Sequence, residues 1–224
     1  MESFEKIRAR AAAQKGGDDA LNALLATATV RTPAEIASLG DDRILSEFSK
    51  RVFQAGFNWK VVENKWDGFE EAFEGFAITR NVFMSDDDFD RHLANKAIIR
   101  HAKKILSIRD NAVFLSDLAK EHGSAARAFA NWPAEDHVGL LALMKKRGAR
   151  LGGMTGQYAL RFLGRESFIL SQDVVTALIA AGVVDKAPTS KTALAATQAA
   201  FNQWKAESGL SLTHLSRVLA LSVG

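Results

Sequence analysis

Basic side chains and one carboxylate gather in a single segment of this sequence. Six lysines and arginines lie from Lys145 to Arg165 with no acidic residue among them, and Asp173 follows shortly afterwards. Gly152 and Gly153 mark a tight turn inside the basic stretch. A compact turn that presents free backbone amides at a helix N-terminus is suited to a phosphate. The segment therefore predicts a helical hairpin that grips a nucleic-acid backbone and places a carboxylate beside it.

The hairpin is expected to span residues 137–165. A first helix runs from His137 to Lys146, and a second short helix carries Tyr158 and Phe162 at helical spacing. Arg100 and His101, further upstream, are either additional phosphate contacts or an ordinary surface pair at a helix start. The predicted DNA contacts are Lys145, Lys146, Arg147, Arg150, Gly152, Gly153, Thr155, Gly156, Arg100 and His101.

Aromatic residues are dense between Phe48 and Phe83. Aromatics at helical spacing usually pack into a core, but one or two could line a slot for a flat heterocycle. Trp59 and Phe57 are the best candidates, because they follow a helix-ending glycine where side chains can face a cleft. The predicted pocket for a base consists of Trp59, Phe53, Phe57 and Tyr158, and the predicted wedge that fills the vacated space is Phe57 or Asn58.

Composition narrows the fold class. The chain has 224 residues, of which 47% are hydrophobic and 25% charged, as in an ordinary globular protein. Only three prolines and many alanines and leucines favour helix over sheet. We therefore expect an all-α fold in one helical domain over residues 1–224. The net charge of +3 is weaker evidence for nucleic acid than the local basic cluster.

The absence of cysteine excludes disulfides, cysteine-ligated zinc and iron–sulfur clusters, and it fits a reducing compartment. The first residues lack the apolar core of a signal peptide, and no apolar run is long enough to span a bilayer. The sequence thus predicts a cytoplasmic protein with no membrane partner and no metal site.

Helix-start signals recur along the chain. Thr32-Pro33 predicts a cap followed by proline at the first helical position, and Ser85 precedes an acidic first turn. Asp18 or Asp19 is expected to cap an early helix. Two helices, at about 190–207 and 211–222, are expected to finish the chain, the last capped by its serine.

The hairpin resembles that of the helix-hairpin-helix DNA glycosylases. In the stretch from Leu151 to Ala159, Gly153 stands at the central glycine of the family's Leu-Pro-Gly-Val-Gly-x-x-Thr-Ala pattern, and Ala159 at its alanine. Three positions depart from that pattern: Gly152 replaces its proline, Thr155 its second glycine and Tyr158 its threonine.

Further stretches are similar to 3-methyladenine DNA glycosylase I. The run from Gln54 to Trp59 resembles its Gln-Ala-Gly-Leu-Ser-Trp, and residues 98–101 and 145–148 resemble other parts of it in the same order. Together the matches span about residues 45 to 175. The resemblance implies two helical lobes around a cleft and a monofunctional enzyme.

Two features depart from that enzyme. Arg51 stands where it has a glutamate, and this chain lacks the cysteines that help to hold its zinc. Conversely, the stretch around Asp173 resembles the Leu-Pro-x-Asp of the type II alkylbase enzymes, whose aspartate is catalytic. In an alternative alignment, Ser171 takes the position of the catalytic aspartate. In a third interpretation, Asp173 is only the N-cap of a helix at 174–182.

The resemblance implies base-excision repair of DNA. The reaction is hydrolysis of the N-glycosidic bond of alkylated purines such as 3-methyladenine after base flipping. Asp173 would stabilise the positive charge that develops on the deoxyribose, and Trp59 would offer its face to a cationic base. The implied partner is double-stranded DNA with an alkylated base, bound by a monomer. No cofactor is implied, although the hairpin could bind a monovalent cation.

Two other classes of protein remain open at this stage. One is a non-catalytic helix-hairpin-helix protein that binds damaged or unusually structured DNA. The other is an all-helical interaction domain whose basic stretch is a solvated face.

Overall fold

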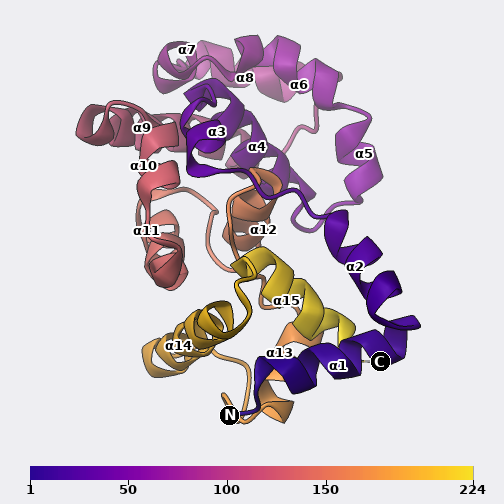
Figure 1. The fold of residues 1–224 in the computed structure, drawn as a ribbon. Coiled ribbons are helices and arrows are strands. Elements are labelled where there is room, and N and C mark those ends of the chain that lie inside the picture. The colour runs from indigo at the N-terminus through magenta and orange to yellow at the C-terminus, as the bar shows by residue number, and fades with distance from the viewer. Residues whose placement is uncertain (224) are drawn as a thin grey trace. The chain divides into compact units, whose positions relative to one another are not determined.

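The computed structural model describes residues 1–223, and every regular element in that range is a helix (Figure 1). The prediction of an all-α fold is confirmed. The elements are α1 Phe4–Lys15, α2 Asp18–Ala26, α3 Pro33–Ala37, α4 Asp41–Gln54, α5 Trp59–Glu63, α6 Trp66–Ala72, η1 Glu74–Phe76, α7 Ile78–Val82, α8 Asp86–Ala94, α9 Ala102–His122, α10 Ala125–Asn131, η2 Ala134–Asp136, α11 His137–Arg147, α12 Met154–Phe162, α13 Gln172–Ala180, α14 Lys191–Ser208 and α15 Leu212–Leu221.

The chain divides into two compact units, which are described separately. Unit 1 contains residues 1–31, 132–140 and 164–224, and unit 2 contains residues 32–131 and 141–163. The expectation of a single domain over residues 1–224 stays a prediction, and its last residue lies outside the described range.

Several predicted helix starts are confirmed. Thr32 forms a capping box with Glu35 ahead of Pro33, and Ser85 forms one with Asp88. Ser211 accepts a hydrogen bond from a backbone N–H in the first turn of α15. Each hydroxyl satisfies a backbone N–H that the helix itself leaves without an acceptor.

Other predicted boundaries are wrong. The residue before α2 is Gly17, so Asp18 and Asp19 lie inside the first turn, where a carboxylate favours the positive end of the helix dipole. The helix expected at 174–182 begins at Gln172 instead.

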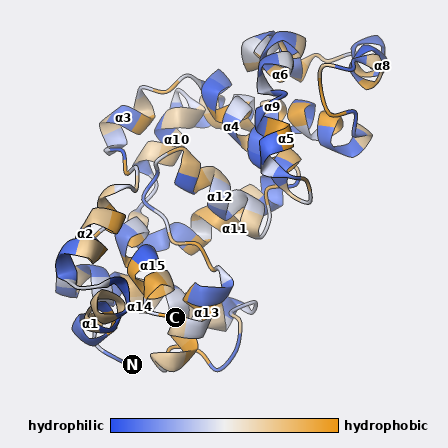
Figure 2. Ribbon diagram, turned by 90° about the vertical axis from the view of Figure 1, so that its right-hand side faces the viewer, coloured by the Kyte–Doolittle hydropathy of each residue, from blue (hydrophilic) through white to orange (hydrophobic). Residues whose placement is uncertain are grey.

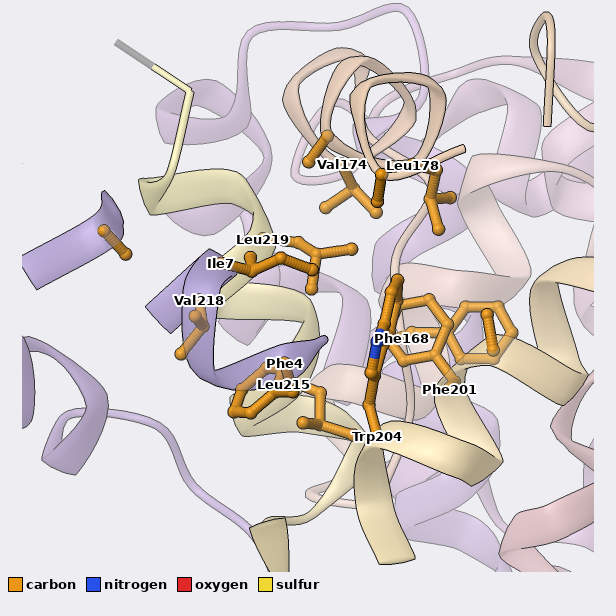
Figure 3. Packing of buried hydrophobic residues seen from close by; sticks show 14 of the residues in the cluster. Phe4, Ile7, Phe168, Val174, Leu178, Phe201, Trp204, Leu215, Val218 and Leu219 are labelled. Atoms are coloured by element: carbon orange, nitrogen blue, oxygen red, sulfur yellow. The ribbon is translucent and has the colours of Figure 1, made fainter. Parts of the chain in front are cut away.

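The core of unit 1 joins the N-terminal helices to the C-terminal ones. Figure 3 shows Phe168, Phe201 and Trp204 side by side, and the rings of Phe168 and Phe201 stack with centroids 4.2 Å apart. The indole Nε1 of Trp204 donates to the backbone oxygen of Glu2 at 3.1 Å. Burial of these large apolar surfaces is the main force that holds α1 against α14 and α15.

Unit 2 has an aromatic core of its own. Trp66, Phe69, Phe73 and Phe76 stack in sequence and are all buried, and Phe48 meets Phe129 edge to face at 5.5 Å. Most of the dense aromatics between residues 48 and 83 are thus core. In Figure 2 many helices carry both hydrophobic and hydrophilic colours, as amphipathic packing requires.

A half-buried acid holds the start of α10. The carboxylate of Asp41, in the first turn of α4, accepts hydrogen bonds from the backbone N–H groups of Ala125 and Ala126 at 3.0 and 2.9 Å. It therefore caps α10 from another helix and fixes α10 against α4.

Within the described part of the chain, no helix is both long enough and apolar enough to cross a membrane.

Candidate functional site

The turn that follows α4 is held by a buried lysine. Lys104, on α9, is 3% exposed, and its ammonium donates to the backbone oxygens of Phe53 and Ala55 at 3.1 and 2.6 Å. Lysine at a helix C-terminus satisfies carbonyls that have no partner within the helix. The same ammonium lies 4.4 Å from the ring centroid of Phe57. This role of Lys104 could not be predicted, because nothing in its local sequence distinguishes it from a surface lysine of an amphipathic helix.

Burial lowers the pKa of Lys104 to about 8, with Arg150 as a second, smaller cause. The unfolded chain retains its proton up to the ordinary value of 10.5, so between about pH 8 and 10.5 the unfolded state binds more protons. We expect the free energy of unfolding to rise with pH over this window relative to that of Lys104→Met. Chemical denaturation of both proteins from pH 7 to 10 measures the difference, and parallel curves would contradict it.

The predicted hairpin is present between α11 and α12, and two glycines permit its geometry. Gly153 has a φ of 59°, a conformation that strains other residues. A Cβ added at Gly156 would lie 2.3 Å from the backbone oxygen of Leu151, so any side chain would force the turn away from α12. These glycines shape the turn, and whether it contacts DNA stays a prediction.

The hairpin is fixed to α9 by Asn111, which is wholly buried. Its side-chain oxygen accepts from the N–H of Ala149 at 2.8 Å, and its amide nitrogen donates to the oxygen of the same residue at 3.1 Å. The side-chain amide of Asn111 thus pairs with both backbone groups of Ala149, as the backbone of a neighbouring strand would do. The sequence pattern gave no signal for this contact, since the two residues lie far apart in the chain.

We expect Asn111→Leu to destabilise the protein by about 1–3 kcal/mol, because it removes both hydrogen bonds that this wholly buried side chain makes to the half-buried backbone of Ala149. Thermal and urea unfolding of the variant measure the loss. Asn131→Ala is the matched control, since Asn131 is exposed at the end of α10 in the same unit. Equal stability of both variants and the native protein would show that the turn needs no anchor.

A pocket of about 180 Å³ opens in unit 2 between the turn that follows α4 and the start of α12. This volume is below the roughly 300–1,000 Å³ typical of sites for drug-sized ligands, and it suits one small ring system. The pocket is lined by Arg51, Gln54, Ala55, Gly56, Trp59, Met154, Thr155 and Tyr158.

The aromatic wall of this pocket is formed by side chains of two helices, α5 and α12. Trp59 is 42% exposed and meets Tyr158 and Phe162 edge to face, at 5.5 and 5.9 Å between ring centroids. Of the predicted base-pocket residues, Trp59 and Tyr158 line the pocket. Phe53 does not, because it is fully buried against Phe69, and its placement in the predicted pocket is corrected to the core.

The two predicted wedge residues lie on the α4–α5 turn. Phe57 is 39% exposed and sits outside the pocket lining, with its ring edge toward His101 at 6.2 Å. The side-chain oxygen of Asn58 accepts from the N–H of Lys60 at 2.9 Å and caps α5. The ring of Phe57 contacts Lys104 and His101, and the side chain of Asn58 is held in its cap, so a wedge role for either residue stays a prediction.

The side chains predicted to contact DNA differ in their exposure and in their ion pairs. Lys145, Lys146 and Arg150 are exposed around the hairpin. Arg147 instead forms a two-point ion pair with Glu121, at 3.0 and 2.7 Å, which orients it along α9. That pairing raises the pKa of Arg147.

Among the upstream basic residues, Arg100 is exposed and His101 is half-buried at the start of α9. Thr155 lies in the pocket lining rather than on the outer face of the hairpin. DNA contact by all of these residues stays a prediction.

Two polar side chains of the pocket lining, Arg51 and Gln54, come from α4 and are buried. Arg51 Nε pairs with Glu47 Oε1 at 2.6 Å, and its guanidinium lies 3.9 Å from the ring centroid of Phe162. Burial lowers the pKa of Arg51 and raises the pKa of Glu47. Gln54 donates through Nε2 to Glu63 at 2.9 Å.

The predicted catalytic carboxylate lies in unit 1. Asp173 is exposed and is the second residue of α13. Ser171 is the N-cap, since its hydroxyl accepts from the N–H of Val174 at 3.3 Å, so the interpretation of Asp173 as the cap is wrong. The catalytic role of Asp173 stays a prediction. In the described range, no cluster of three or more histidine, aspartate or glutamate side chains is arranged to hold a metal.

The described residues form an all-helical fold, with a helical hairpin and a small aromatic pocket beside its second helix. The methyladenine glycosylase family matches residues 37–146, which include α4, α9 and most of the first hairpin helix. The predicted resemblance to 3-methyladenine DNA glycosylase I is confirmed for this segment of the chain.

Solved structures of similar fold are known. A structure of 3-methyladenine DNA glycosylase I from Staphylococcus aureus shares 20% identity, covers 62% of this chain and 81% of its own, and has a TM-score of 0.52. A mutant of the same enzyme shares 19% identity, covers 67% and 89%, and has a TM-score of 0.51. A further structure of 3-methyladenine DNA glycosylase I shares 25% identity, covers 55% and 79%, and has a TM-score of 0.48. No curated protein matches the chain significantly.

Proposed function

We propose that this protein is a monofunctional DNA glycosylase of base-excision repair, which hydrolyses the N-glycosidic bond of alkylated purines such as 3-methyladenine. The observation that carries this proposal is the pocket in unit 2, whose wall joins Trp59 of the α4–α5 turn to Tyr158 of the hairpin's second helix. The match of residues 37–146 to the methyladenine glycosylase family supports the same function.

Hydrolysis of the N-glycosidic bond requires few protein side chains. Water attacks C1′ of the deoxyribose, the N-glycosidic bond breaks, and its electron pair leaves with the base. Positive charge develops on the sugar in the transition state, and a carboxylate near C1′ would stabilise it and orient or deprotonate the water. We assign this role to Asp173, the exposed acid at the start of α13.

The base must first leave the helical stack, at a cost of a few kcal/mol. Stacking on Trp59 and insertion of Phe57 into the vacated space would offset that cost. Lys145, Lys146 and Arg150 would neutralise phosphates of the duplex. We further propose that the protein acts as a monomer on double-stranded DNA in the cytoplasm, and that the hairpin carbonyls bind a monovalent cation.

Release of free base from methylated DNA tests the function. The protein in excess is mixed with duplex treated with a methylating agent, and the bases released are separated and identified by mass spectrometry. We expect 3-methyladenine to be released with single-exponential kinetics and an abasic strand to remain intact until alkali is added. Firm binding of the duplex with no base released would favour a non-catalytic DNA-binding protein instead.

We expect Trp59→Ala to slow base release by about tenfold while affinity for undamaged duplex changes little, because stacking contributes roughly 1–3 kcal/mol per base. Phe83→Ala is the control, since Phe83 is 81% exposed in the same unit and lies outside the pocket. Equal rates for the two variants would remove Trp59 from base recognition.

A further inference from the structure

One face of α9 holds both the pocket and the hairpin. Lys104 donates to the backbone oxygens of Phe53 and Ala55 in residues 53–58, which we call the pocket turn. Asn111 pairs with both backbone groups of Ala149 in the hairpin. The two side chains are seven residues apart, or about two helical turns, so they project from the same side of α9. Helix α9 therefore sets the position of the pocket turn relative to the hairpin.

The pocket turn supplies much of the pocket. Gln54, Ala55 and Gly56 line it, and Trp59 follows directly after the turn. Across the pocket, the ring of Trp59 meets Tyr158 of α12 at 5.5 Å between centroids. Any movement of the pocket turn would therefore change the spacing between the two aromatic walls. The ammonium of the buried Lys104 opposes such movement, since it bonds to two carbonyls of the turn at once.

Arg150 connects Lys104 to the surface that is predicted to bind DNA. It directly follows Ala149, is exposed, and has a φ of 61°, which is uncommon for a residue other than glycine. Such a backbone conformation persists only where surrounding contacts impose it, and the bonds from Asn111 are contacts of this kind. Burial and then the positive charge of Arg150 lower the pKa of Lys104. A phosphate paired with Arg150 would therefore remove a repulsion that Lys104 experiences in the free protein.

We propose that Lys104 is a positioning residue for base excision, which fixes the pocket turn more firmly once a DNA phosphate has neutralised Arg150. Contact between the hairpin and DNA then favours the charged form of Lys104. A charged donor forms hydrogen bonds roughly twice as strong as those of a neutral one, so the pocket turn is held best on bound DNA. This inference rests on the proposed glycosylase function and adds a coupling between DNA contact and the pocket.

Proton uptake on binding tests the coupling without any excision. Undamaged duplex is titrated into the full chain at pH 8 by calorimetry, in two buffers with different ionisation enthalpies. The difference in heat gives the number of protons taken up. We expect an uptake of up to about half a proton, because the pKa of Lys104 in the free protein is about 8 and half of the molecules have lost this proton.

Two variants assign the proton. Lys104→Met should abolish the uptake. Lys120→Met should retain it, because Lys120 lies on the same helix and pairs with Asp117. No uptake by the native protein, or equal uptake by Lys104→Met, would overturn the coupling and leave the glycosylase function standing.

The pH dependence of base release gives a second readout. The ratio kcat/KM reports on groups of the free protein, and the saturated rate reports on those of the complex. We expect kcat/KM for 3-methyladenine release to fall above about pH 8, whereas the saturated rate stays level to a higher pH. Lys104→Met should lower the saturated rate by about tenfold or more, since a small misplacement of the pocket is costly, and should remove the alkaline fall. A lysine with a purely structural role would leave both profiles of the native protein flat.

Arg150→Gln keeps the test decisive if Lys104→Met fails to fold. It removes the cation that acts on Lys104, so the midpoint of the kcat/KM profile should move to higher pH. Lys146→Gln is the matched control, because it also removes an exposed cation of the hairpin and should leave the midpoint in place. Equal midpoints in the two variants would exclude the coupling. If methylated duplex is bound with proton uptake but releases no base, the glycosylase function fails while the coupling of Lys104 to DNA contact is retained.

Discussion

Asp173→Asn is expected to reduce base release by about a hundredfold or more, a magnitude typical of losing one acid–base or electrostatic group at a reacting centre. The change keeps the shape of the side chain and removes its charge. Asp173 is exposed and does not cap α13, so folding and DNA affinity should be nearly unaffected. Single-turnover release of 3-methyladenine from methylated duplex measures the effect.

Two companion variants isolate the role of this carboxylate. Asp185→Asn removes an exposed acid elsewhere in unit 1 and should retain the full rate. Ser171→Ala tests the second register. It should lower stability by about 1 kcal/mol through loss of the N-cap, with little change in rate. A full rate for Asp173→Asn would exclude catalysis by this residue.

Reversal of two charges at the hairpin should have a comparably large effect on binding. The double variant Lys146→Glu with Arg150→Glu is expected to weaken duplex binding by about a hundredfold or more near physiological salt, since both residues are exposed and phosphate contacts dominate such affinities. The slope of log affinity against log salt should also become shallower by about 2. Fluorescence anisotropy across a salt series measures both quantities.

The matched control makes the same two charge reversals in unit 1. Lys186→Glu with Lys191→Glu makes an identical change in net charge on exposed residues far from the hairpin in sequence. If this control weakens binding as much as the hairpin variant, attraction by overall charge is responsible. In that case the turn at Gly152 and Gly153 has no special part in binding.

Local signals in the sequence predicted the elements well. Caps such as Thr32 and Ser85 depend on residues three positions away, so they are visible in one stretch of chain. The hairpin and the exposure of Trp59 were likewise predicted from a glycine and its neighbours. Phe53 was misplaced because burial depends on what packs over a helix, here Phe69, and not on its own helical register.

The contacts that could not be predicted join segments distant in the chain. Lys104 bonds to carbonyls about fifty residues earlier, and Asn111 bonds to Ala149. Neither residue differs from its neighbours in type or periodicity, and a hydrogen bond between remote segments leaves no pattern in a single sequence.

The division of the chain between the two units has a consequence for the order of folding during synthesis. Unit 2 is complete once Leu163 has been added, whereas unit 1 also requires residues 164–224. Helices α1 and α2 are made before unit 2, yet Phe4 and Ile7 belong to the same core as Phe201 and Trp204, which are made after it. Since domains generally fold as units on the ribosome, α1 and α2 stay without their tertiary core until α14 and α15 have been made. Their apolar faces are then the part of the nascent protein most in need of protection from aggregation.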